Sequence, residues 1–108
     1  MQIKKTYTEV NPELLNAEIK DFILKQGAVL GEDKMETYTL PNESATFVSR
    51  STMTFSVNNK ECLRVHTVGS TRSETKLMID VDEKLFPQEK LAALQADIDF
   101  IFGNYEVK

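Results

Sequence analysis

The sequence predicts an α+β fold, a two-layer sandwich in which two helices cover one face of an antiparallel sheet of four to five strands. Three observations predict it. From Ala45 to Val81, apolar residues recur at every second position, which is typical of strands with one buried face. Residues 12–26 and 87–102 instead repeat apolar residues with the period of a helix. Because each helix has one apolar stripe and the sheet has one apolar face, packing both helices on that face buries all three.

The chain begins with a short predicted strand and a capped helix. Residues 2–9 alternate loosely, with Ile3 and Tyr7 on one side. Asn11 followed by Pro12 is typical of a helix start, and Gly27 ends the predicted helix after Gln26. The apolar stripe of this helix consists of Leu15, Ile19, Phe22 and Ile23.

The next segment is harder to interpret. Residues 27–31 fit either the start of a strand or a buried connection, and the polar residues 32–34 favour a turn. Residues 35–40 then resume an extended pattern. We expect Tyr38 to face the core with Phe47, and Leu40 with Ala45, which leaves residues 41–44 as a loop.

Parity determines the expected register of the central strands, because opposite residues share a face. Pairing Phe55 with Leu63 and Met53 with Val65 leaves residues 58–60 as a three-residue hairpin loop, since a two-residue Asn-Asn turn would break the match. At the next connection we prefer to pair Val65 with Ile79, with Ser70 to Glu74 as the loop. Pairing Val65 with Leu77, with Ser70 to Arg72 as the loop, is the alternative.

A second helix follows Val81. Pro87 fits its first turn, and Gly103 fits a left-handed residue just past its end. Its stripe consists of Leu91, Leu94, Ile98 and Ile101, with Phe102 beside them. The expected order β-α-β-β-β-β-α is similar, in topology only, to compact relatives of the helix-grip and TATA-binding-protein-like folds. No sequence motif adds to that resemblance, and topology alone does not imply a function.

Length and composition predict one globular domain over residues 1–108. The 12.3 kDa chain is 41% hydrophobic and 28% charged, as in ordinary globular proteins. A net charge of −4 without a basic cluster disfavours nucleic-acid and anionic-membrane binding. The sequence has no secretory h-region, no run of roughly 18 apolar residues, and Cys62 as its only cysteine. We therefore expect a cytoplasmic location.

The even-numbered positions of the central strands define the outer face of the sheet, away from the helices. In the preferred register Arg64 lies opposite both Asp80 and Thr54, and His66 lies between Thr52 and Met78. A solvated face with cross-strand ion pairs is the first interpretation of this pattern.

The candidate site for a ligand or partner consists of Arg50, Arg64, His66 and Arg72. Arginine suits bidentate contacts with anions. Arg50 and Arg72 lie near the predicted hairpin at residues 69–73, whose hydroxyls and loop N–H groups suit an anionic small molecule or an acidic partner segment.

Residues for catalysis are not evident in the sequence. Cys62 and His66 share a strand, but four residues in a strand separate their Cα atoms by about 13 Å, far beyond hydrogen-bond contact. Cys62 is better explained as a half-buried filler on the outer face. One histidine and one cysteine are too few for a metal site, and no phosphate-binding loop is present. We expect no catalytic residues, no metal and no cofactor.

Three functions remain as hypotheses. The first is a non-enzymatic interaction module that self-associates or binds a protein through its outer sheet face or an edge. The alternative is a helix-grip carrier that holds an apolar or anionic small molecule between the last helix and the sheet. Its cavity would be lined by Phe86, Leu91, Leu94 and Phe102 with Phe47, Met53 and Phe55. An enzyme of unknown type is the third hypothesis.

Overall fold

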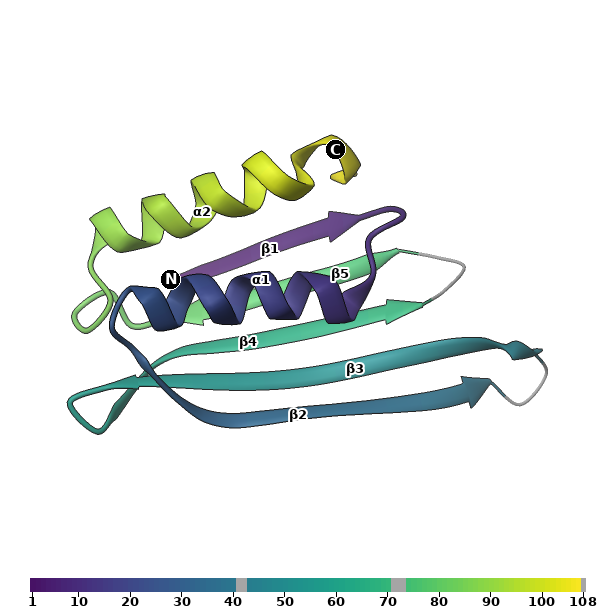
Figure 1. Ribbon diagram of the computed structural model, residues 1–108, viewed down its shortest axis with the longest axis horizontal. Helices are drawn as coiled ribbons and strands as arrows, with labels where there is room; N and C mark the ends of the chain where they lie inside the picture. Colours follow the sequence, from purple (N-terminus) through teal and green to yellow (C-terminus); the bar gives the residue numbers. More distant parts are fainter. Residues whose placement is uncertain (41–42, 71–73, 108) are drawn as a thin grey trace.

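The computed structural model describes residues 1–40, 43–70 and 74–107, and the side chains of residues 40 and 43–47 also lie outside the description. The sheet order is β1-β5-β4-β3-β2, with all pairs antiparallel, and both helices cover one face (Figure 1). The elements are β1 (Gln2–Tyr7), α1 (Pro12–Lys25), β2 (Val29–Leu40), β3 (Glu43–Val57), β4 (Lys60–Ser70), β5 (Thr75–Val81), α2 (Gln88–Phe102) and a 3₁₀ turn, η1 (Gly103–Tyr105). The predicted α+β sandwich is confirmed, with five strands.

Helix α1 forms where its capping residues predict. The Asn11 side chain accepts a hydrogen bond from the Glu13 N–H at 2.8 Å, and Pro12 fills the first turn. The helix ends at Lys25, and Gly27 has the positive φ of 96° that glycine adopts without steric cost. Leu15, Ile19 and Ile23 are buried, as expected for the apolar stripe.

The end of α2 differs from the expectation. Gly103 is right-handed (φ −59°), because the chain continues into η1 instead of reversing. The residues after the helix attach to β1: the Thr8 N–H donates to the Tyr105 carbonyl and the Val107 N–H to the Thr6 carbonyl, both at 2.8 Å. Ile101, expected on the apolar stripe, is exposed. The tail is thus held against the outer edge of β1.

Strand β2 is a single strand through the segment expected to turn. Charge at residues 32–34 suggested a turn, but the strand absorbs one extra residue there as a β-bulge between Leu30 and Asp33. The Thr54 hydroxyl accepts a hydrogen bond from the Glu32 N–H at 2.8 Å, which satisfies the backbone at the bulge. The charged segment therefore lies within a bulged strand and not in a turn.

The expected orientation of Tyr38 is wrong. Tyr38 lies opposite Val48 and is 49% exposed, and Thr39 instead lies opposite Phe47. Leu40 pairs with Glu43 and not with Ala45, after a second irregularity in the ladder. The expected pairs assumed a regular ladder up to a four-residue loop, but the irregularity between Thr39 and Leu40 offsets the preceding pairs by one residue, so Tyr38 faces outward. The loop expected at residues 41–44 falls partly on residues 41–42, outside the described residues.

The β3–β4 hairpin has a two-residue turn where three residues were expected. Asn58 and Asn59 both have positive φ, 53° and 65°, as a type I′ turn requires. The register still pairs Phe55 with Leu63, because Cys62 is an extra residue in the ladder. That bulge turns Cys62 into the core at 2% exposure, so its expected place on the outer face is also wrong. The turn is one residue shorter than expected and the bulge adds one residue, so the register beyond them is unchanged.

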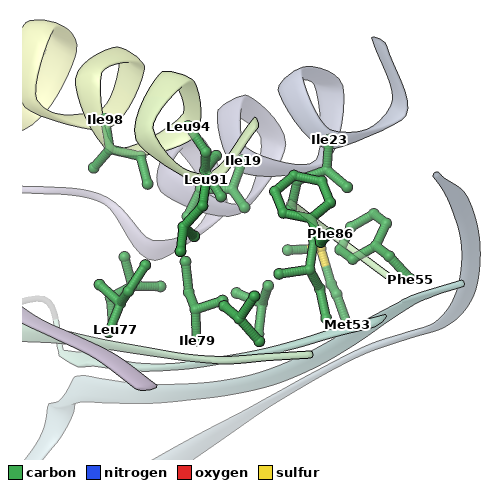
Figure 2. Packing of buried hydrophobic residues seen from close by; sticks show 14 of the residues in the cluster. Ile19, Ile23, Met53, Phe55, Leu77, Ile79, Phe86, Leu91, Leu94 and Ile98 are labelled. Atoms are coloured by element: carbon green, nitrogen blue, oxygen red, sulfur yellow. The ribbon is translucent and has the colours of Figure 1, made fainter. Parts of the chain in front are cut away.

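The core lies between the two helices and the sheet (Figure 2). Met53 and Phe55 of β3, Leu77 and Ile79 of β5, and Phe86 before α2 point toward the helices. Ile19, Ile23, Leu91, Leu94 and Ile98 descend from α1 and α2 to meet them. The residue parity that predicted a buried inner face is therefore confirmed for Met53, Phe55, Leu77 and Ile79, and the side chain of Phe47 lies outside the description.

One polar network crosses this core. The Asn16 amide nitrogen of α1 donates to the Ser51 hydroxyl at 2.5 Å, and the Thr67 hydroxyl donates to the amide oxygen at 2.7 Å. All three residues are buried. Because these polar groups have partners, their hydrogen bonds offset the cost of burying them, and the network aligns α1 with β3 and β4.

Candidate interaction surface

The outer face of the sheet carries the residues that the sequence singled out. The expected register is confirmed here: Arg64 lies opposite both Asp80 and Thr54, His66 lies opposite both Thr52 and Met78, and Val65 pairs with Ile79. Neither α1 nor α2 covers this face (Figure 1). Arg50, Arg64 and His66 therefore share one open surface.

Arg64 is engaged within the chain. Its guanidinium lies 2.9 Å from Oε1 of Glu61, three residues earlier, and a second hydrogen bond joins Nε to Oε2 at 3.3 Å. The Glu61 carboxylate, through its hydrogen bonds and its charge, raises the pKa of Arg64. A bidentate intramolecular pair leaves few donors for an anionic ligand.

His66 is half-buried between its neighbours, and its Nδ1 lies 3.3 Å from the Thr52 hydroxyl. Arg50 is exposed and lies across from Val68 on β4 and Glu36 on β2. Arg72 lies outside the described residues. The three described candidates occupy separate rows of the face and do not converge on one cavity.

Apolar side chains also lie on this face. Val48, Val68 and Met78 are half-buried, and the register places them on the side away from the helices. They lie among Thr52, Lys76 and Arg50, so the face is mixed rather than a continuous apolar patch. Scattered apolar residues of this kind are normal on a surface and do not by themselves indicate a partner.

Sequence reasoning named a sheet edge as a contact surface but did not identify β2 as the strand that forms it. β2 ends the sheet, so over its described part only one side of its backbone pairs with another strand. Among its apolar and aromatic side chains, Val29, Met35 and Tyr38 are exposed at 65%, 37% and 49%. The sequence signal was the continuous run of residues 29–40 without proline, which the charged residues 32–34 concealed.

The opposite edge of the sheet is covered at one end, over residues 6–8. Residues 105–107 lie along β1, where Glu106 bridges to Tyr7 and the backbone bonds of Thr8 and Val107 fill the edge. Lys5 adds ion pairs to Glu106 at 3.3 Å and Asp99 at 3.5 Å. The β1 edge is thus partly paired within the chain, whereas the outer side of β2 has no paired strand over its described part.

A hollow of about 550 Å³ lies at the end of β4 and β5 near Met1. Its lining includes four carboxylates, Glu61, Asp80, Asp82 and Glu83. The Met1 ammonium is held by the Val81 carbonyl at 3.2 Å, and Glu61 is already paired with Arg64. Across the described residues, no group of three or more ligating side chains is arranged to hold a metal ion.

The groups with reactive potential lie apart from one another. Cys62 is in the core and His66 is on the outer face, so the sheet separates them. Burial raises the pKa of the Cys62 thiol, which disfavours the nucleophilic thiolate. Burial also raises the pKa of Tyr7, whose hydroxyl has no hydrogen-bond partner in the described part of the chain.

The residues that a helix-grip carrier needs are packed. Phe86, Leu91 and Leu94 are at most 1% exposed and belong to the same core cluster as Met53 and Phe55 (Figure 2). Phe102 is partly buried and stacks edge-on against Tyr7, with ring centroids 6.2 Å apart. These side chains are therefore part of the close-packed core.

No helix in the described ranges is long and apolar enough to span a bilayer. Comparisons of the chain with protein-family models, with curated proteins and with solved structures find no match in any of the three.

Proposed function

We propose that this protein is a non-enzymatic interaction module that self-associates, acts in the cytoplasm, and uses the edge of β2 as its contact surface. The observation that supports the proposal is the difference between the two sheet edges. The tail pairs with residues 6–8 at the end of β1, whereas no segment in the described ranges pairs with the outer side of β2, which is twelve residues long.

An uncovered edge of this length favours strand addition. Its free N–H and C=O groups offer main-chain hydrogen bonds to an incoming strand, and alternate side chains set the specificity. Short edge strands, proline and covering segments are the usual protections against such pairing. β2 contains no proline and lies outside the helix layer in Figure 1, so its protection rests on its charges and one bulge.

Sedimentation velocity over a wide concentration range tests this function. We expect a monomer–dimer equilibrium with a dimer fraction that grows with concentration. A strict monomer up to about 1 mM, where even a contact worth about 4 kcal/mol is half occupied, would contradict self-association.

A further inference from the structure

The sequence of β2 determines how two edges would meet, given the proposed function on which this inference rests. A twofold axis perpendicular to the sheet relates two antiparallel edge strands and keeps each side chain on its own face. Opposite residues are therefore both outer-facing or both helix-facing. Only registers centred on a single residue of β2 satisfy this condition.

Charge distinguishes these registers. An axis at Lys34 places two lysines opposite each other and Glu32 opposite Glu36, and an axis at Asp33 or Glu36 also places a residue opposite its own like charge. An axis at Thr37 forms no charge pair among these residues. An axis at Met35 places Lys34 opposite Glu36 of the second copy, and Glu36 opposite Lys34 of the second copy.

We propose that two copies of this chain join their β2 edges antiparallel about Met35, which forms one continuous ten-stranded sheet. Charge complementarity supports this register. Lys34 and Glu36 are both on the outer face, and Glu36 already lies opposite Arg50 of β3. The pairing extends this row so that Arg50, Glu36 and the second Lys34 alternate in sign across the interface.

The helix-facing side fits the same register. Met35 lies opposite Ser51 of β3 on the face that bears α1, and it is 37% exposed at the end of the sheet. On the axis it meets its own copy, so two flexible apolar side chains cover each other. Asp33, which pairs with Lys20 at 3.1 Å, faces the neutral Thr37 of the second copy.

Charge exchange tests the register. Lys34→Glu and Glu36→Lys each place like charges opposite each other twice, and each is expected to weaken the dimer about tenfold. The double variant restores opposite charges and wild-type association. An equimolar mixture of the two single variants is expected to form heterodimers more tightly than either variant forms homodimers. Circular dichroism of each variant checks that the fold is intact.

Cysteine trapping tests it independently. In a directly opposed pair the Cβ atoms lie about 4.5 to 5.5 Å apart, close to the reach of a disulfide. Mild oxidation should therefore cross-link the Met35→Cys variant fastest among single cysteines placed at positions 33 to 37. The wild-type chain is the control, because Cys62 is 2% exposed and should not react.

The outcomes distinguish the proposed register at Met35 from the proposed self-association on which it rests. Dimers in which Lys34→Cys or Thr37→Cys cross-links fastest overturn the register but keep the self-association. Dimers unaffected by every β2 variant but lost in Val68→Lys overturn the edge contact and assign the interface to the outer face. A monomer under all conditions overturns both proposals.

Discussion

Glu18 of α1 lies beside Asp97 of α2, and the two carboxyls affect each other. The neighbouring Asp97, which can share a proton with Glu18, raises the pKa of Glu18, and partial burial adds to the effect. Asp97 Oδ2 is buried, and no partner for it occurs within the described residues. A protonated Glu18 can donate a hydrogen bond to Asp97, whereas an ionised Glu18 can only accept.

The sign of the resulting pH dependence follows from linkage. A carboxyl whose pKa is higher in the folded state than in the unfolded state stabilises the fold while protonated, and this contribution is lost as pH rises through the folded pKa. At pH 7 the ionised form of Glu18 is therefore unfavourable for helix packing. Acidification toward the ordinary pKa of 4.5 relieves this unfavourable effect.

Glu18→Gln should raise the melting temperature at pH 7 by about 2 °C, the equivalent of a few tenths of a kcal/mol for a like-charge helix pair. Glutamine keeps the shape and can donate to Asp97. Near pH 4 the gain should vanish, because Glu18 is then largely protonated. Thermal melts at both pH values measure this, with the exposed Glu74→Gln as the matched control. An equal gain at pH 4 would exclude carboxyl repulsion as the cause.

At the level of elements, the β3–β4 turn shows how local backbone conformation sets the register. Asn59 has a φ of 65°, a conformation that alanine adopts at a cost of about 1 kcal/mol and glycine without cost. Asn tolerates it because its short polar side chain bonds locally.

Asn59→Ala should therefore lower the free energy of unfolding by about 1 kcal/mol, whereas Asn59→Gly should leave it unchanged or raise it slightly. Urea denaturation of both variants measures the difference. The two substitutions remove the same side chain and differ only in the added methyl group. Equal stabilities would mean that the turn is not held in the left-handed conformation.

The same hairpin shows how much of the fold the sequence could predict. Parity placed Phe55 opposite Leu63 and Val65 opposite Ile79, because a slip would expose the apolar face. Parity could not distinguish a three-residue loop from a two-residue turn followed by a bulge, since both preserve the alternation beyond it. Cys62 was therefore assigned to the wrong face.

The candidate site was predictable to a similar extent. Register placed Arg64 beside Asp80 and His66 beside Thr52. The hydrogen bond between Arg64 and Glu61 depends on side-chain conformations, which a sequence pattern does not reveal. The exposed edge of β2 depends on the strand order, in which β1 pairs with β5 at one edge of the sheet and β2 forms the other edge. That order arises from packing of the whole molecule, so the sequence pattern of β2 alone does not reveal it.

Across the whole molecule, the two margins of the sheet provide a built-in comparison. At the end of β1 the tail closes the edge within one chain, where the Thr8 N–H donates to the Tyr105 carbonyl and the Val107 N–H donates to the Thr6 carbonyl. The outer amides of β2 have no such cover in the described structure. Self-association through β2 should therefore slow amide hydrogen exchange in β2 as the protein concentration rises. Exchange in β1 should stay unchanged.

Hydrogen exchange measured by mass spectrometry at low and high protein concentration tests this expectation. Peptides that cover residues 31–39 should exchange more slowly at high concentration, because dimer formation protects these amides by mass action. At a total protein concentration about ten times the dissociation constant, about one chain in five is monomeric, so the outward-facing amides of β2 should exchange about fivefold more slowly. Peptides from β1 should exchange equally at both concentrations, and the Lys34→Glu variant should lose the difference at β2. Slowing of β1 and β2 together would indicate a general rise in stability and not a contact at the β2 edge.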